Sequence, residues 1–219
     1  MLRVSAGQAL GPDPTPVPAS EWARRLELEG ADGILLQETA PASPGSRAPW
    51  LRELAGVLSI PFALEAPFQD RAELEEALEA GVDKVVLAAS VALEDAWLAA
   101  AVARFGRVHV AVAVNARLAA GPRGQAGPEG RDALAWMTEL EQRGCGEILL
   151  GAEPEGAACA ALVQGAAQLS LTLLFRAGDQ ARAAEALLHG ADGVACPDLD
   201  RSPRQWKQAL AVHGLTFRD

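Results

Sequence analysis

The sequence has few cysteines, few basic residues and no long apolar stretch, and each shortage excludes a class of protein. Its three cysteines, Cys145, Cys159 and Cys196, match no metal-binding spacing, so we expect buried thiols in a reducing cytoplasm. Lysine and arginine total 19 against 29 acidic residues, and the formal charge of −10 argues against a nucleic-acid surface. No run of about 18 apolar residues occurs and no basic-then-apolar pattern opens the chain, so we expect a soluble, cytoplasmic protein without a membrane anchor.

A short phrase occurs four times in the chain. The tetrapeptides that begin at Gly30, Gly81, Gly144 and Gly190 each follow an amphipathic, Ala/Leu/Glu-rich stretch and lead into an apolar run. A glycine at the end of a helix supplies the left-handed residue that closes the last turn. A continuous apolar run is typical of a parallel strand that is buried on both faces. With a further strand between the copies, the repeats predict eight β/α units.

Eight strands and eight helices are therefore expected to alternate. The strands are predicted over residues 2–6, 33–37, 61–65, 84–89, 108–114, 147–151, 170–175 and 193–196. The helices are predicted over residues 20–29, 49–58, 70–80, 94–105, 131–143, 156–167, 179–189 and 203–213. This order predicts the α/β class and a single (β/α)8 TIM barrel with a two-fold internal repeat, with half-barrels at 1–106 and 107–219. An open doubly wound sheet is the alternative.

Two segments interrupt the regular pattern. Residues 11–18 contain four prolines and must be extended rather than helical. Residues 116–130 are rich in Gly, Pro and Arg and lack periodicity, which fits either a mobile lid or a solvated loop. Both segments follow a strand and precede a helix, which places them on the face where such barrels carry their sites.

Four blocks of sequence carry a family resemblance. Residues 20–37 resemble the first helix and second strand of the cyclase subunit of imidazole glycerol phosphate synthase, and residues 80–85 resemble the approach to its fourth strand. Residues 132–150 are the most specific block, and residues 186–193 resemble the approach to strand eight. The resemblance covers residues 20–219, and the related histidine-pathway isomerase barrel is a more distant second. It implies a barrel that binds a substrate with a phosphate at each end, and no cofactor is expected.

The acid–base pair that the resemblance implies is missing. The family uses two aspartates, one at the end of strand one and one at the end of strand five, on opposite sides of the substrate. Here residues 1–12 contain no Asp or Glu, and the strand-one position falls near Gly7. Asn115 stands at the strand-five position, and its amide cannot exchange a proton near neutral pH as a carboxylate can. The cyclase chemistry is therefore predicted to be lost.

The phosphate-binding positions that the resemblance implies also differ. After strand three, Glu65-Ala66-Pro67 replaces a glycine triplet; Pro67 lacks an N–H donor, and Glu65 would repel a dianion. Three ligand-binding candidates remain after strands four and seven: Ser90, Arg176 and Gly178. Arg176 could bind an anion through its charge. We expect at most weak binding of a small anionic metabolite.

Carboxylates at the strand ends are the other candidates for chemistry. Glu38, Glu65, Glu153 and Asp198 come from strands two, three, six and eight and are expected to face one cavity, where they could act as acids or bases, hold a divalent cation, or lie in solvated loops. Glu153 or Asp198 could instead form a salt bridge with Arg176. No metal site is predicted, because none of the histidines stands at this end of the strands. His109 is expected within strand five, and His189 and His213 are expected at helix ends.

Two hypotheses of different classes follow. The first is a non-catalytic relative that acts as a binding or partner subunit, with a protein partner or a second copy of itself and without nucleic acid or membrane. The second is an enzyme of altered chemistry that uses the remaining Glu, Asp and Arg residues on a small metabolite. Weak residual cyclase (lyase) activity is a third reading. The absence of both acids favours the first.

Overall fold

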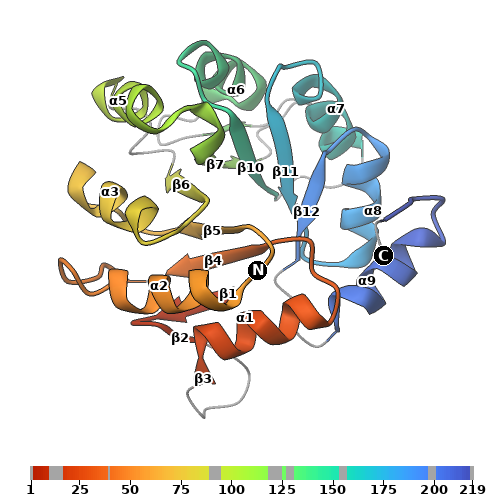
Figure 1. The fold of residues 1–219 in the computed structure, drawn as a ribbon. Helices are drawn as coiled ribbons and strands as arrows, with labels where there is room; N and C mark the ends of the chain where they lie inside the picture. Colours follow the sequence, from red (N-terminus) through yellow and green to blue (C-terminus); the bar gives the residue numbers. More distant parts are fainter. Residues whose placement is uncertain are drawn as a thin grey trace. The chain divides into compact units, whose positions relative to one another are not determined.

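The computed structural model describes residues 2–9, 17–38, 40–88, 95–117, 125–126, 131–152, 157–196 and 201–217. Within these ranges the parallel strands and the helices alternate as the sequence predicts (Figure 1). The chain divides into two compact units. Unit 1 comprises Met1–Val86, Asp198–Gln208 and Phe217–Asp219, and unit 2 comprises Leu87–Pro197 and Ala209–Thr216.

Unit 1 contains parallel strands in the order β6-β5-β4-β1, and a small antiparallel hairpin follows β1. The parallel strands are β1 (Leu2–Ser5), β4 (Ile34–Glu38), β5 (Phe62–Glu65) and β6 (Lys84–Ala88), of which Leu87 and Ala88 already belong to unit 2. The hairpin strands are β2 (Gln8–Ala9) and β3 (Val17–Pro18), and the helices are α1 (Ala19–Leu28), α2 (Ala48–Val57) and α3 (Arg71–Glu79).

Unit 2 repeats this plan, with parallel strands in the order β7-β10-β11-β12 and an antiparallel hairpin after β7. The parallel strands are β7 (Val110–Arg117), β10 (Glu147–Ala152), β11 (Thr172–Arg176) and β12 (Gly193–Ala195). The hairpin strands are β8 (Gln125–Ala126) and β9 (Arg131–Asp132). The helices are α5 (Asp95–Phe105), α6 (Ala133–Gln142), α7 (Ala157–Ala166) and α8 (Gln180–Leu188), with the short 3-10 turn η1 (Arg107–His109) before β7.

The shared order of strands, hairpin and helices confirms the predicted α/β fold of the TIM-barrel type with a two-fold internal repeat. The hairpins themselves were not predicted. Residues 116–130 were expected to be irregular, whereas β7 continues to Arg117 and β8 lies at 125–126. The proline-rich segment is extended at Val17–Pro18, as expected, and residues 11–16 lie outside the described ranges.

The predicted helix ends are confirmed by the backbone. The repeated glycines Gly30, Gly81, Gly144 and Gly190 all have positive φ, between +89° and +111°. Helices α3, α6 and α8 begin after aspartates whose carboxylates accept a backbone N–H three residues on, as Asp70 does from Glu73 at 2.9 Å. The starts of β7 and β11 were predicted two residues too early. His109 therefore lies in η1 and is exposed, and β11 begins only at Thr172.

The strands of unit 1 alternate between a buried and a more open face. Leu2 and Val4 of β1 and Leu36 of β4 are fully buried, and the helices cover this face (Figure 1). The next residues along each strand point to the other face, which carries polar side chains toward the carboxyl ends of the strands. In unit 2, β7 from Val110 to Val114 is buried on both faces, as a central parallel strand should be.

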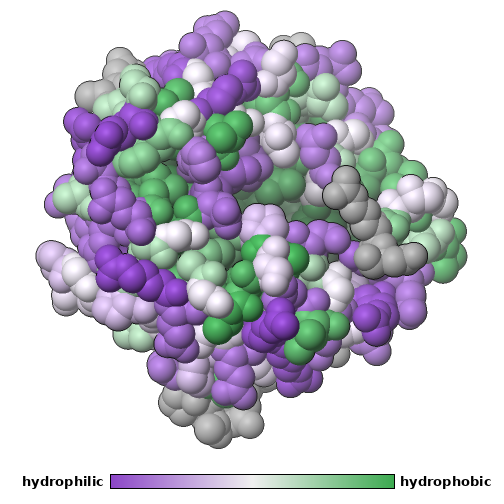
Figure 2. Space-filling model, in the orientation of Figure 1, coloured by the Kyte–Doolittle hydropathy of each residue, from purple (hydrophilic) through white to green (hydrophobic). Residues whose placement is uncertain are grey.

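Unit 1 also contains the start of the last helix, α9 (Pro203–Ala211), beside the turn that follows α1. The backbone N–H of Arg204 donates to the carbonyl of Glu29 at 3.0 Å, and Lys207 Nζ donates to Asp32 Oδ1 at 2.8 Å. Hydrophilic and hydrophobic residues are interspersed over the face shown in Figure 2. Among the described residues, no helix has both the length and the apolar character needed to cross a bilayer.

Candidate functional site

The carboxyl end of the parallel strands in unit 2 brings the predicted site residues into one row. Asn115 of β7 lies opposite Gly151 of β10, Gly151 lies opposite Arg176 of β11, and Arg176 lies opposite Ala195 of β12. Residues paired across neighbouring strands point to the same face of a sheet. Asn115 and Arg176 therefore share one face at one end of unit 2, as the sequence predicts, with two small residues in the same row.

The side chain of Asn115 leans over the neighbouring strand. A Cβ atom added to Gly151 would lie 2.2 Å from Asn115 Oδ1, so the amide occupies the space that any other residue at 151 would need. Asn115 is exposed, and its amide can donate and accept hydrogen bonds but cannot titrate. The strand-five position thus holds a polar group suited to binding rather than to proton transfer.

In the loop between β11 and α8, polar groups that could bind a ligand already have hydrogen-bond partners within unit 2. The N–H of Ala177 donates to the carbonyl of Ala195 at 3.1 Å, and the Asp179 carboxylate accepts the N–H of Arg182 at 2.9 Å. Asp179 therefore places a negative charge at the N-terminus of α8, where a phosphate would otherwise be favoured. Gly178 is exposed, and nothing lies within 4 Å of a Cβ added there.

In the corresponding loop of unit 1, between β5 and α3, the backbone N–H donors at Phe68 and Gln69 also have acceptors already. Pro67 has no N–H, that of Phe68 donates to the carbonyl of Ala66 at 2.9 Å, and that of Gln69 donates to Glu73 Oε2 at 3.2 Å. Glu65, at the end of β5, accepts a hydrogen bond from Gln37 Nε2 at 3.3 Å. The loop thus presents a half-buried carboxylate and no cluster of backbone donors for a dianion.

The end of β1 turns away from the strand direction. Ala6 and Gly7 have φ of 48° and 77°, and Ser5 pairs with Gln8 across them. Two successive residues with positive φ make the tight turn typical of a two-residue hairpin. Gly7 therefore lies in the turn, and the last β1 residue on the face of Arg3 and Gln37 is Ser5.

Space for a side chain at Gly7 is already taken by Trp50 of α2. A Cβ atom at position 7 would lie 2.8 Å from both Cβ and Cγ of Trp50, and the positive φ of Gly7 adds strain for any L side chain. The described residues therefore offer no carboxylate and no room for one at this turn.

A buried ion network lies on the face of β4 opposite Gln37, and the sequence did not predict it. Glu38 was predicted to face the cavity at the strand ends, which is wrong: it is buried on the other face of β4 and pairs with Arg47. Arg47 Nε donates to Glu38 Oε2 at 2.7 Å and Nη1 donates to Glu73 Oε2 at 2.6 Å, with all three side chains at most 8% exposed. Burial opposes the charge of Arg47, but its hydrogen bonds to Glu73 and Glu38 outweigh this effect and raise its pKa. The guanidinium also lies 5.2 Å from the ring centre of Phe68.

Phe68 and the three charged residues form a clamp between the loop before α2 and the start of α3. Glu76 extends this clamp, because its carboxylate accepts the N–H groups of Gly45 and Ala48 at 3.1 and 3.0 Å. The sequence predicts no helix or strand between the strand at 33–37 and the helix at 49–58, where Arg47 lies. A lone arginine in a loop gave no signal, because its partners lie 9 and 26 residues away.

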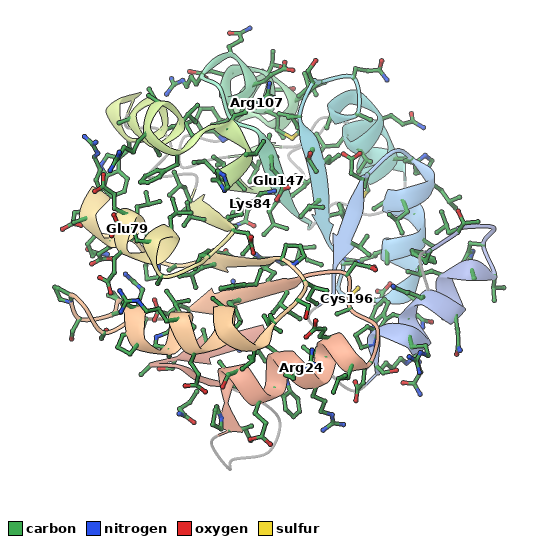
Figure 3. All side chains as sticks on the ribbon, in the orientation of Figure 1. Arg24, Glu79, Lys84, Arg107, Glu147 and Cys196 are labelled. Atoms are coloured by element: carbon green, nitrogen blue, oxygen red, sulfur yellow. The ribbon has the colours of Figure 1, made fainter. Side chains whose placement is uncertain are left out.

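Three predicted site residues, Ser90, Glu153 and Asp198, lie outside the described ranges. Among the residues that the structure describes, no group of three or more His, Cys, Asp or Glu side chains could hold a metal ion. Cys196 follows β12 directly (Figure 3).

Fold and strand-end geometry define a protein of the TIM-barrel type with a two-fold repeat. Within that class, the model for the family described as "Histidine biosynthesis protein" matches residues 14–152. Imidazole glycerol phosphate synthase subunit HisF of Acidobacterium capsulatum is 31% identical over 221 aligned positions, covering 91% of this chain and 86% of that protein. The same subunit of Myxococcus xanthus is 33% identical over 137 positions, covering 59% of this chain and 54% of that protein. The chain belongs to the histidine biosynthesis protein family.

Proposed function

We propose that this chain is a member of its family that does not carry out the cyclase reaction and acts instead as a binding or partner subunit. The observation that carries the proposal is that neither of the two positions where the family has a catalytic aspartate holds a carboxylate. Asn115 places an amide over Gly151, and the chain at Gly7 is a hairpin turn packed against Trp50. General acid–base catalysis contributes about 10²–10⁴-fold for each group, so the loss of two should bring the rate near background.

The phosphate-binding loops support the same proposal. The N–H groups of Phe68 and Gln69 in unit 1 and of Ala177 in unit 2 all have acceptors within their own unit. Arg176 would then supply most of the attraction for an anion. A single charge-assisted contact is worth about 1.5–3 kcal/mol, which leaves phosphate affinity around millimolar or weaker once ordering costs are counted.

The partner role draws support from the opposite end of the strands. In unit 2, Val108, Leu188 and Val212 are 65%, 57% and 84% exposed. Val108 lies just before β7, Leu188 ends α8 before β12, and Val212 follows α9. Exposed apolar side chains at the edge remote from Asn115 suit a protein surface rather than a small-molecule site. The relatives are themselves described as subunits of a synthase.

A cyclase assay tests the proposal directly. The purified chain is incubated with the ribulosyl substrate of the cyclase family and ammonia, and the subunit from Acidobacterium capsulatum serves as the active control. We expect no turnover above the rate without enzyme. Turnover that Asn115→Ala abolishes would refute the proposal, because Asn115 would then take part in the reaction.

The partner role has its own test. Sedimentation of the chain alone reports self-association, and mixing it with the remainder of imidazole glycerol phosphate synthase reports a heterologous complex. We expect one of these two assemblies to form. Val212→Asp should weaken it, and Ala103→Asp, at an exposed position of α5, should leave it unchanged. A monomer that binds nothing in either experiment would contradict the partner role.

One observation favours an alternative function. Glu65 and Gln37 hydrogen-bond to one another at the ends of β5 and β4, which is a polar pair that a packed core does not need. In an altered reaction on a small metabolite, the Glu65 carboxylate would act as the acid or base and Gln37 would hold it in place. Product formation from a library of small metabolites that Glu65→Gln abolishes, without loss of the fold, would favour this alternative.

A further inference from the structure

We propose that the start of α3 forms a carboxylate-binding site, and that the side chain of Glu73 is its built-in occupant. The site consists of the Arg47 guanidinium and the backbone N–H of Gln69, which meet at one oxygen of Glu73. All three residues belong to unit 1. The site takes a monocarboxylate, and it is closed to ligands from solution as long as Glu73 fills it.

Two donors from separate segments converge on the same atom. Glu73 Oε2 accepts from Arg47 Nη1 at 2.6 Å and from the N–H of Gln69 at 3.2 Å. The side chains of Arg47 and Glu73 are 2% and 8% exposed, so the contact is shielded from solvent. Hydrogen bonds between ionised groups are shorter and stronger than neutral ones, and an arginine fork suits the geometry of a carboxylate.

The two carboxylates around Arg47 do not use all of its donors. Nε donates to Glu38 and Nη1 donates to Glu73, but Nη2 is buried and has no hydrogen-bond partner among the described residues. An unpaired N–H of a buried charged group costs free energy, so such groups are rare in folded proteins. A carboxylate that is not tied to the α3 backbone can bring its second oxygen to Nη2 and form the two-pronged contact that a guanidinium favours.

Helix capping does not explain Glu73. Asp70 already caps α3 by accepting the N–H of Glu73 at 2.9 Å. A glutamate three residues after the cap usually accepts the N–H of the cap residue itself, whereas Glu73 accepts that of Gln69, one residue earlier. In unit 2, α8 is capped in the same way by Asp179 and has Arg182 at the corresponding position. A glutamate at this position is therefore not needed for the cap.

Removing the occupant should open the site. Glu73→Ala deletes a carboxylate and one methylene, which together have the size of an acetate ion, and leaves the donors of Arg47 and Gln69 in place. Acetate should then bind with a dissociation constant on the order of 10 mM, as expected for two charge-assisted contacts. At about 100 mM acetate, the unfolding equilibrium of this variant should shift about tenfold toward the native state.

Urea unfolding measures this shift, with sodium chloride at the same ionic strength as the comparison. In ¹⁵N-labelled Glu73→Ala, the signals of the Gln69 amide and the Arg47 Nε–H should move with the same dissociation constant. Three proteins should not respond to acetate. They are the wild type, Glu73→Gln, which refills the space with a neutral amide, and Glu79→Ala, which removes an exposed carboxylate from the end of the same helix.

Chloride that stabilises Glu73→Ala as well as acetate does would overturn the inference, and so would saturable acetate binding at Gln69 in the wild type. A Glu73→Ala variant that stays unfolded in acetate would also overturn it, because acetate would then not replace the lost carboxylate. None of these results depends on cyclase turnover, so the inference and the proposed function fail separately.

Discussion

Trp50 packs against Gly7 so closely that a Cβ atom at position 7 would lie 2.8 Å from the tryptophan Cβ. This contact joins the first turn of α2 to the tight turn between β1 and β2. It matters for function because the family's strand-one acid was expected near this turn. A carboxylate can be introduced two residues earlier, at Ser5, which lies on the strand face shared with Arg3 and Gln37.

We predict that restoring the acids does not restore cyclase activity. Ser5→Asp combined with Asn115→Asp supplies two carboxylates. The loop after β5 would still lack free donors for a phosphate, because Pro67 has no N–H and the N–H groups of Phe68 and Gln69 are hydrogen-bonded within the loop and to α3. Catalysis needs the substrate held in place as well as the proton-transfer groups. The assay measures turnover of the ribulosyl substrate with ammonia, and a rate clearly above that of the parent chain would contradict the prediction.

The buried clamp around Arg47 should dominate the stability of unit 1. Arg47→Ala leaves Glu38 and Glu73 as two buried carboxylates without their cation, and breaking such a pair costs about 3–5 kcal/mol. Arg24→Ala is the control, because Arg24 is 44% exposed and its pair with Glu27 is worth at most about 1 kcal/mol. Urea unfolding followed by circular dichroism measures both.

A compensated variant separates lost charge pairing from lost packing. Arg47→Met with Glu38→Met and Glu73→Met removes all three charges while keeping similar volumes. It should recover most of the stability that Arg47→Ala loses, since replacing a buried ion network with apolar groups of similar volume is often close to neutral. Equal instability of the two variants would show that the charges are not what the clamp contributes.

The sequence determined much of the fold because its signals are local. The glycines at 30, 81, 144 and 190 end helices through a backbone conformation that glycine favours, and the apolar runs after them need no distant partner to be recognised. The hairpins after β1 and β7 were missed because strands of two residues have too few positions to show alternation.

The site was harder to predict because its contacts are distant in sequence. Asn115 and Arg176 could be placed at one end of the strands from the β/α order alone. That Asn115 leans over Gly151, or that Trp50 fills the space at Gly7, depends on strand register and helix packing, which a single sequence does not specify. The clamp at Arg47 depends on the same kind of information.

The cysteines should differ sharply in reactivity. Burial raises the pKa of the Cys145 thiol to about 11 and that of Cys159 to about 11, whereas Cys196 is partly exposed beyond β12. Only the thiolate reacts, so at pH 8 a disulfide reagent should label Cys196 rapidly and the other two only after unfolding. Rapid labelling of Cys145→Ala/Cys196→Ala, which retains Cys159 alone, would contradict the burial of that thiol.

Cys145 should also weaken the fold at alkaline pH. The unfolded chain loses the thiol proton near 9.0 and the native protein near 11, so the native state holds more protons between these values. The free energy of unfolding should therefore fall as pH rises from about 9 to about 11, by on the order of 2–3 kcal/mol for this group. Urea unfolding across that range should show a shallower decline in Cys145→Ala, and an identical slope would contradict the assignment.

Two glycines should respond to alanine with opposite signs. A Cβ at Gly146, just before β10, would lie 2.0 Å from the carbonyl oxygen of Arg107, whose side chain in turn donates to the Ser170 carbonyl at 2.6 Å. Because the clash is with a backbone atom, Gly146→Ala should lower the free energy of unfolding by about 1–3 kcal/mol or more. Gly56 lies within α2 with nothing within 4 Å of a Cβ, so Gly56→Ala should gain up to about 1 kcal/mol by restricting the unfolded chain. Urea unfolding of both variants checks the prediction, which a tolerated Gly146→Ala would contradict, because the strand could then move away from η1.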